Sequence, residues 1–462
     1  KMGAIQILRA AMCLRTWAAL AAATVLGPCL AGTTESPLPS AIWMAPILNP
    51  GGYSSEALSY ALALQQAYSS APNDSSGAHA QFGLKQFAEQ VNQGFVQELP
   101  EHTLEVLGSL FEVGRDRPGW DVAICHATPD IWLEDGAFGW GNVEPCPPPD
   151  TRFAVGRTMY ETDRVPEGWV PRINKMHEVW VPSSWGLEQF IRSGVDAAKV
   201  FVVPEAVDIA LFDPAKHKPL ETLMVASDPE VFRFLSVFKW EKRKGWDILL
   251  RAYFEEFSSD DPVTLHIKTQ AFHSGSDFDA VLKEFTGNMT APRKPLARYS
   301  VSAEDLPLAD LPRLYRSADV FVLPSRGEGW GRPHVEAMSM GLPIIATNWS
   351  GSTEFLSERC TLPLRIDGLV EVEEGQAPKG HRWAEPSVSH LRELMRWTAE
   401  HRREAQNLGR LAREEMVTRF SPEVIARDHV LPRLRAIRSQ LGSEQEAKPS
   451  IRGGRIDRIH EI

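Results

Sequence analysis

Two glutamates lie eight positions apart in the segment GEGWGRPHVEAMSMGLP, residues 327–343. Eight residues make a little over two helical turns, which would nearly align Glu328 and Glu336 on one helix face. The glycines that follow Glu328 instead place it in a loop, and Pro333 suits the first turn of the next helix. We therefore expect Glu328 on the loop, Glu336 on the helix, and both carboxylates in one cleft.

Carboxylates in these two positions suit the recognition of hydroxyl groups. Glu328 can accept hydrogen bonds from two vicinal hydroxyls, and Glu336 can do the same for a ribose. A helix-dipole role is the alternative, and it would explain a glutamate near the helix start. It does not explain Glu336 in the middle of an apolar helix face, where a carboxylate needs polar partners.

A second group of charged residues lies in FKWEKRKGWDILL, residues 238–250. Lys239 ends an expected buried strand, and Lys244 stands before Gly245 at the start of the next helix. Two cations at a helix N-terminus suit a diphosphate. The alternative is that residues 241–244 form only a solvated charged loop, but their position directly after a strand favours the anion site.

The elements that would position these residues form two alternating arrays. Apolar runs predict strands at 41–47, 120–127, 178–183 and 199–207, and then at 232–240, 262–269, 319–325 and 342–348. Helical patterns follow several of these strands, beginning with a glycine-rich turn and helix over 49–68 and ending with helical stretches over 387–419 and 421–441. The pattern predicts an α/β protein with two doubly wound, Rossmann-like domains that face each other across a cleft.

Composition excludes several classes of protein. The chain has 462 residues and a formal net charge of -11, without a basic stripe, which argues against nucleic-acid binding. Five cysteines in a chain of this length do not indicate a disulfide framework, and we expect Cys125 to be an ordinary buried strand residue. No His/Cys spacing indicates a metal site.

The N-terminal segment has the composition of a targeting sequence. Lys1, Arg9 and Arg15 accompany an alanine- and leucine-rich run over about 16–30, with no acidic residue before Glu35. This resembles a secretory signal peptide or a short signal anchor, which predicts the lumen or membrane of the ER or Golgi. A transit peptide for a plastid or mitochondrion is the alternative.

The predicted organisation therefore has five parts. These are a targeting segment and linker over 1–40, an N-terminal Rossmann-like domain over 41–205, a C-terminal Rossmann-like domain over 206–420, a helix over 421–441 and a flexible tail over 442–462.

With these motifs in order, the chain resembles the retaining, nucleotide-sugar-dependent glycosyltransferases of family 4, which have the GT-B fold. The resemblance covers about 41–440 and is strongest over 233–356. Glu328 and Glu336 match the pair of glutamates of that family. Lys239 and Lys244 match its arginine and lysine on the diphosphate, although a lysine in place of the arginine keeps the charge and loses the bidentate fork.

Two weaker matches lie in the first half of the chain. Gly51 and Gly52 match the glycine-rich first turn of the family. The interdomain signature appears as PEAVD, residues 204–208, in which Glu205 and Ala206 replace the usual Asn-Gly.

The resemblance implies transfer of a hexose-type sugar from a nucleotide diphosphate sugar to a hydroxyl of a glycan, lipid or protein, with retained anomeric configuration. The two lysines would stabilise the departing diphosphate, so that neither a metal nor a cofactor is needed. Glu328 would hold the donor sugar with help from the backbone at Gly329. Trp330 would either stack on the sugar or only form the wall of the site.

The resemblance also suggests a catalytic contact for His126, at the end of an N-domain strand, with a purely structural histidine as the alternative. The acceptor would meet the segment 156–169. The candidate acceptor contacts there are Arg157, Tyr160, Glu161 and Asp163, with an ordinary surface loop as the alternative. Two other functions remain open, namely a catalytically idle GT-B binding module and a GT-B sugar-nucleotide epimerase.

Overall fold

The structure is a computed structural model. It describes residues 37–72, 79–117, 119–132, 145–220, 228, 230–271, 277–290, 292–373 and 377–446. Residues Lys1–Ser36 are a unit of their own, so the predicted targeting segment and membrane anchor lie outside the described residues, as does most of the predicted tail. Within the described ranges, no helix combines the length and the apolar character that crossing a bilayer requires.

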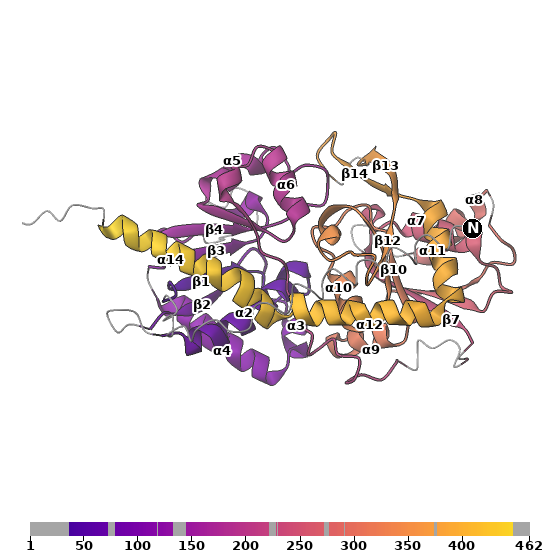
Figure 1. The fold of residues 1–462 in the computed structure, drawn as a ribbon, viewed down its shortest axis with the longest axis horizontal. Helices are drawn as coiled ribbons and strands as arrows, with labels where there is room; N and C mark the ends of the chain where they lie inside the picture. The colour runs from indigo at the N-terminus through magenta and orange to yellow at the C-terminus, as the bar shows by residue number, and fades with distance from the viewer. Residues whose placement is uncertain are drawn as a thin grey trace, which may run out of the picture. The chain divides into compact units, whose positions relative to one another are not determined.

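The first half of the chain forms a six-stranded parallel sheet in the order β2-β1-β3-β4-β5-β6 (Figure 1). Its strands are β1 Ala41–Ala45, β2 Phe82–Gln86, β3 Val122–His126, β4 Phe153–Arg157, β5 Glu178–Val181 and β6 Val200–Val202. Its helices are α2 Gly52–Ser70, α3 Gln93–Glu98, α4 Glu101–Asp116, α5 Trp169–Lys175 and α6 Ser184–Arg192.

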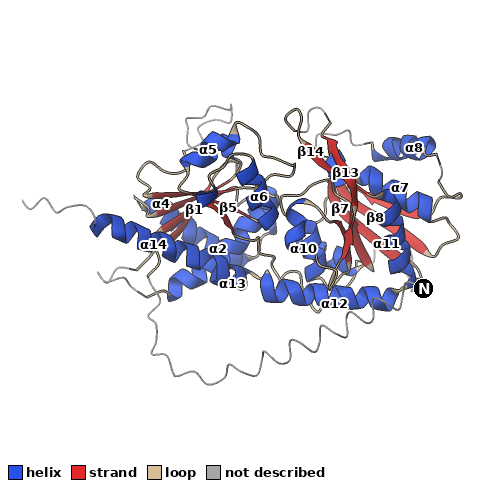
Figure 2. Ribbon diagram, turned by 45° about the horizontal axis from the view of Figure 1, so that its top comes forward, coloured by secondary structure: helices blue, strands red, loops and turns tan. Residues whose placement is uncertain are grey.

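The second half forms another six-stranded parallel sheet, in the order β12-β11-β10-β7-β8-β9 (Figure 2). Its strands are β7 Phe232–Trp240, β8 Val263–Ala271, β9 Arg298–Ser302, β10 Val320–Leu323, β11 Ile344–Thr347 and β12 Leu362–Leu364. Its helices are α7 Trp246–Glu256, α8 Phe278–Asn288, α9 Leu311–Arg316, α10 Arg332–Ser339, α11 Val388–Glu400 and α12 Arg402–Arg419. An antiparallel hairpin, β13 Ile366–Glu371 with β14 Arg382–Pro386, follows the sheet.

The predicted fold class is confirmed, and the reason is visible in the strands. Every residue of β1, β3, β10 and β11 is buried, as expected for strands covered by helices on both faces. These four strands are among those that the sequence predicted from continuous apolar runs. The predicted domain boundary at 205/206 falls between β6 and β7, the last strand of one sheet and the first of the other.

The C-terminal helical stretch returns to the first half of the chain. It consists of α13 Pro422–Ile425, a π-helical turn Ala426–Val430 and α14 Leu431–Glu446. Arg433 on α14 forms an ion pair with Glu178 on β5, and Arg152 donates to the carbonyl of Leu441 (3.2 Å). The sequence predicted this helix but not the sheet on which it packs.

The prediction that Cys125 is a buried strand residue is confirmed, since it lies on β3. The structure adds a disulfide that the sequence did not lead us to expect, between Cys125 and Cys146, 21 positions further along. Both cysteines are fully buried. A single pair in a long chain has no spacing signature, so the sequence alone did not indicate it.

Candidate functional site

The turn after β7 brings Lys244 to the loop after β10. Residues Lys242–Lys244 form a 3₁₀ turn, and Gly245 adopts a left-handed conformation (φ 68°) before α7 begins. A Cβ atom on Gly245 would lie 2.0 Å from the carbonyl oxygen of Pro324, so only glycine permits this approach. The close contact between the two chain segments places the cations of the turn beside Glu328.

Glu328 lies at the centre of a cluster of charges. The ammonium of Lys244 is 2.7 Å from Oε1 and 2.9 Å from Oε2 of Glu328. Nη1 of Arg243 donates to Oε2 of Glu328 (3.1 Å) and to the carbonyl of Gly327 (2.8 Å), while Nη2 donates to Glu241 (2.8 Å). The motifs therefore do converge, with Arg243 as an additional cation.

The loop that carries Glu328 is buried and held from two sides. The backbone N–H of Glu328 donates to Ser350 Oγ (2.9 Å), and the N–H of Gly351 donates to the carbonyl of Glu328 (2.9 Å). Arg326 forms ion pairs with Asp247 on α7 and Glu385 on β14. The Glu328 carboxylate is thus presented by a rigid backbone.

Electrostatics keep Glu328 ionised. Burial by itself raises the pKa of the Glu328 carboxyl, but the positive charges of Lys244 and then Arg243 outweigh it and lower the pKa to about 2. Lys239, at the end of β7, is half-buried, and this burial lowers the pKa of its ammonium. The structure places Lys239 in the electrostatic field of Glu241 and Lys244.

Glu336 lies on α10, as predicted, in a buried position. The hydroxyl of Tyr315 donates to its Oε2 (2.9 Å), and Nε of Arg332 lies 3.8 Å from its Oε1. Burial raises the pKa of Glu336, and the nearby charge of Arg332 and the Tyr315 hydrogen bond oppose that rise. A carboxylate held by one tyrosine keeps acceptor capacity for ribose hydroxyls.

The side chain of Trp330 does not line a sugar site, contrary to the prediction. The indole is 1 % exposed and packs edge-on against Phe355 and Phe420. Trp330 is therefore part of the core, and only its backbone borders the Glu328 loop. Gly329 next to it is covered by Met159, since a Cβ on Gly329 would lie 2.4 Å from the Met159 side chain.

Gly51 and Gly52 lie exposed at the start of α2. The first turn of α2 faces the second half of the chain, because a Cβ on Gly52 would lie 4.0 Å from Cγ of Arg332. Arg332 in turn donates to the carbonyl of Ala206 (2.7 Å) and lies 3.6 Å from Glu205. The glycine turn, the interdomain segment and α10 therefore meet around one arginine.

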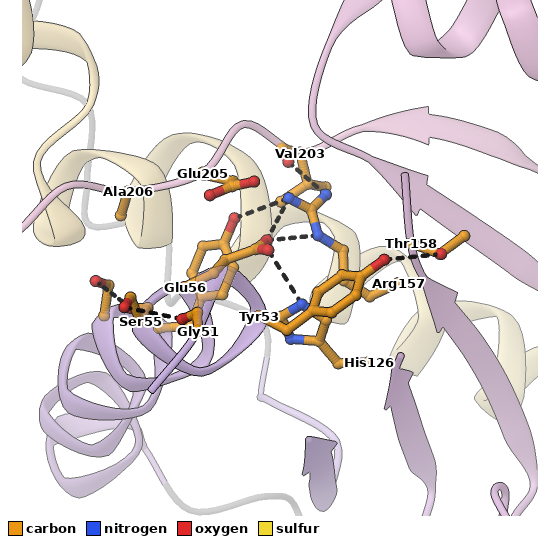
Figure 3. A network of polar contacts seen from close by, with 12 residues as sticks. Gly51, Tyr53, Ser55, Glu56, His126, Arg157, Thr158, Val203, Glu205 and Ala206 are labelled. Carbon is orange, nitrogen blue, oxygen red and sulfur yellow. Dashed lines mark hydrogen bonds and ion pairs between the residues drawn. The ribbon is translucent and has the colours of Figure 1, made fainter. Parts of the chain in front are cut away.

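His126 and Arg157 belong to a buried network rather than to an accessible surface (Figure 3). Both side chains have no exposed area, and both contact Glu56 on α2. Nε1 of Trp43 donates to Nδ1 of His126 (3.1 Å), so the imidazole proton lies on Nε2 and is donated to Glu56 (3.0 Å). Neither ring nitrogen is available to a substrate in this conformation.

Arg157 is likewise not an acceptor contact in this conformation. Its Nε donates to Glu56 (2.6 Å) and its Nη1 to the carbonyl of Val203 (2.6 Å), which ties β4 to the segment before the second half. The sequence pattern could not reveal this, because the partner Glu56 lies about a hundred residues away.

The other three predicted acceptor residues lie where the two halves of the chain touch. Asp163 accepts from the backbone N–H of Arg382 (2.8 Å), and Oε1 of Glu161 is 3.9 Å from Nη1 of Arg243. Tyr160 packs edge-on against His381 and Trp169. All three are partly exposed, and they lie on the side of the first half that faces the Glu328 loop.

Sequence reasoning missed several residues that shape this site. Arg243 and Arg332 lie inside the two quoted motifs, and Arg326 and Ser350 lie just outside one of them, but nothing in their spacing showed which way they point. A surface hollow of about 470 Å³ lies elsewhere, at the amino ends of β4, β5 and β6 beside α14, and is not part of the site.

Comparison with known proteins finds a family match in the second half of the chain. Residues 229–374 match the family model for glycosyl transferases group 1. This range contains Lys239, Lys244, Glu328 and Glu336. Residues 229–374 belong to the group 1 glycosyltransferase family.

Curated relatives of this glycosyltransferase domain are named D-inositol 3-phosphate glycosyltransferase. The protein from Segniliparus rotundus is 30% identical over 156 residues, which cover 34% of this chain and 33% of the relative. The protein from Rhodococcus opacus is 26% identical over 273 residues, which cover 55% of this chain and 58% of the relative. The chain thus spans between a third and three fifths of the length of these two relatives.

Solved structures show the same fold around the glycosyltransferase domain. Anabaena HepE in complex with UDP and glucose has a TM-score of 0.57 at 15% identity, covering 88% of this chain and 100% of that one. Sucrose-phosphate synthase from Thermosynechococcus elongatus has a TM-score of 0.52 at 15% identity, covering 88% and 99%. The fold is GT-B, and the predicted resemblance is confirmed.

Proposed function

We propose that the chain is a retaining glycosyltransferase that moves a hexose-type sugar from a nucleoside diphosphate sugar to a hydroxyl of a glycan, lipid or protein. The observation that carries this proposal is the position of Glu328 against Lys244, where a helix begins, in a group 1 glycosyltransferase domain. Glu328, a carboxylate suited to sugar hydroxyls, is directly hydrogen-bonded to Lys244, a cation suited to a diphosphate.

In the proposed reaction, the bond between the anomeric carbon and the diphosphate oxygen breaks, and its electron pair stays with the diphosphate. Lys239 and Lys244 stabilise this negative charge as it develops. Glu328 holds the sugar hydroxyls and Glu336 holds the ribose. The acceptor oxygen forms the new bond to the anomeric carbon, and its proton passes to the departing diphosphate. Because lysines supply the positive charge, we expect transfer without a metal ion.

The names of similar proteins supply the first probes. Anabaena HepE was crystallised with UDP-glucose, and the curated relatives are named for an inositol phosphate. We therefore propose UDP-sugars as the first donors to test and inositol phosphates as the first acceptors. The contact segment with Tyr160, Glu161 and Asp163 is the proposed place where the acceptor approaches the Glu328 loop.

A donor screen tests this function. The chain from residue 37 onward is incubated with a panel of UDP-, GDP- and ADP-sugars in EDTA, and release of the nucleoside diphosphate is measured. We expect release with one donor, lost in Glu328→Ala and Lys244→Ala and kept in Lys242→Ala. Lys242 is the matched control because its ammonium pairs with Asp247 (2.7 Å) and not with Glu328.

Other outcomes distinguish the alternatives. Donor binding without release, even with a panel of acceptors, would favour an idle binding module. Conversion of one sugar nucleotide into another without an acceptor would favour an epimerase. Release that requires an added divalent cation would contradict the proposed metal independence.

A further inference from the structure

We propose that Arg243 is the permanent partner of Glu328, and that Lys244 leaves Glu328 for the diphosphate when a donor binds. This inference rests on the proposed function of the same site. It makes Arg243 a positioning residue that keeps Glu328 ionised and oriented toward the sugar after the lysine has moved.

Arg243 is held in place by several partners at once. Nη1 donates to the carbonyl of Gly327 (2.8 Å) and to Glu328 (3.1 Å), and Nη2 donates to Glu241 (2.8 Å). Its own carbonyl accepts the backbone N–H of Arg326 (2.6 Å). A planar guanidinium fixed by a carbonyl and two carboxylates would break several hydrogen bonds if it turned toward another anion.

Lys244 is placed differently. Both hydrogen bonds of its ammonium go to the two oxygens of Glu328 (2.7 and 2.9 Å), and its backbone lies directly before α7, an eleven-residue helix. The ammonium is a compact charge on a flexible stem, so rotation of the stem can redirect it. A diphosphate at this helix start carries more negative charge than one carboxylate and would compete for the ammonium.

The exchange has a cost that Arg243 can offset. Without a cation, a carboxylate as buried as Glu328, which is 5 % exposed, would take up a proton and lose part of its acceptor capacity. His334 on α10 also faces Glu328, but burial lowers the pKa of its ring, which leaves it neutral near pH 7. Arg243 is therefore the cation that remains with Glu328.

Arg243 also connects the site to the first half of the chain. Its Nη1 lies 3.9 Å from Oε1 of Glu161, and a Cβ on Gly327 would lie 2.0 Å from the carbonyl of Glu161. The Glu161 segment consequently covers Arg243 and Gly327 from one side, which limits the directions in which the guanidinium can move.

Two measurements on four variants test the exchange. Binding of UDP, GDP and ADP is measured by calorimetry for the wild type, Arg243→Gln, Arg243→Lys, Lys244→Gln and the control Lys242→Gln. Turnover is then measured against pH between 4 and 8 with the donor that the screen identifies. We expect Lys244→Gln to weaken nucleoside diphosphate binding by about 10-fold or more, since it removes one charge-assisted contact.

Arg243→Gln should behave differently from Lys244→Gln. Nucleoside diphosphate affinity should change by about 2-fold or less, while turnover should fall by about 10- to 100-fold. In its pH profile, activity should be lost as the pH falls, and at a higher pH than in the wild type, because burial without a nearby cation raises the pKa of Glu328 above the usual carboxyl range. Arg243→Lys should restore part of the turnover, and Lys242→Gln should match the wild type.

Three results would overturn the inference. Equal loss of nucleoside diphosphate binding in Arg243→Gln and Lys244→Gln would make Arg243 a direct ligand of the diphosphate. Unchanged turnover and an unchanged pH profile in Arg243→Gln would remove its positioning role. A wild-type chain that binds no nucleoside diphosphate would overturn the proposed function and this inference together, whereas the first two results leave the proposed function intact.

Discussion

Arg157 on β4 and Glu56 on α2 form an ion pair in which neither side chain has any exposed surface. The pair lies in the interior of the first half of the chain, where Tyr60 and His126 also contact it. Burial by itself would raise the pKa of Glu56, but Arg157 and His126 outweigh it and lower the pKa to about 2. The carboxyl of Glu56 is therefore ionised at neutral pH and is the negatively charged member of this network.

Arg157→Met should destabilise the chain strongly, because it leaves the carboxylate of Glu56 buried without its main counter-charge. We expect a loss of about 3–5 kcal/mol in the free energy of unfolding. Arg157→Met combined with Glu56→Gln should lose less than the single variant. Denaturant midpoints of the single and double variants give the coupling energy.

Arg164→Met is the matched control for that series. Its side chain is 53 % exposed and pairs with Asp163, so its removal should change stability by less than about 1 kcal/mol. The paired-charge account would be contradicted if the double variant lost as much free energy of unfolding as the two single variants together.

Glu205 should make stability depend on pH in the neutral range. Burial raises the pKa of Glu205 well above its usual value, and the negative charge of Glu56 adds to this, while Arg332 opposes it. When the folded-state pKa is raised, the contribution of the carboxyl to the free energy of unfolding is fully present below its unfolded pKa of about 4.5. This contribution is lost as the pH rises through the folded-state pKa.

Glu205→Gln should therefore flatten the pH dependence. Between pH 5 and 8, the melting temperature of the variant should fall less steeply than that of the wild type, because glutamine cannot ionise. Thermal melts at half-unit pH intervals check this. A variant with the same slope as the wild type would mean that Glu205 does not change its protonation in this range.

Gly351→Ala should disable the Glu328 loop. A Cβ at this position would lie 1.9 Å from the carbonyl oxygen of Gly329, and the other nearest atoms are also backbone atoms, of Gly329 and Glu328, which cannot rotate away. We expect nucleoside diphosphate binding to weaken by more than about 10-fold, since the loop must shift. Calorimetry with UDP measures the loss.

Two glycines provide the comparison for Gly351→Ala. Gly329→Ala should be milder, because the obstructing atoms belong to the flexible side chain of Met159. Gly108→Ala, on the exposed face of α4, meets no atom within 4 Å and should slightly stabilise the helix. Similar binding loss in all three variants would show that the effect does not come from the loop.

The disulfide between Cys125 and Cys146 should contribute to stability by closing a loop of about 20 residues. Replacing both cysteines by alanine should lower the free energy of unfolding by about 2–4 kcal/mol. Reductant should lower the melting temperature of the wild type and not that of the double variant. Cys360→Ala, which removes a buried free thiol, should keep the wild-type response to reductant.

The sequence by itself determined the fold class and the placement of Glu328 on a loop and of Glu336 on the helix that follows. Continuous apolar runs such as 122–125 and 320–323, alternating with helical patterns, favour buried parallel strands, and glycines with a proline mark the loop and helix around Glu328. These signals are local, because each depends on neighbouring residues along the chain. The strands β2, β4 and β9 lack such runs and were not predicted.

Only the tertiary structure decided which charges meet. Arg243 and Lys244 contact Glu328 across about 85 positions, Arg157 meets Glu56 across 101, and Cys125 meets Cys146 across 21. Side-chain direction also decided that Trp330 faces the core and that His126 is enclosed. Long-range pairing depends on how two sheets and their crossing helices pack, which no local pattern of residue types encodes.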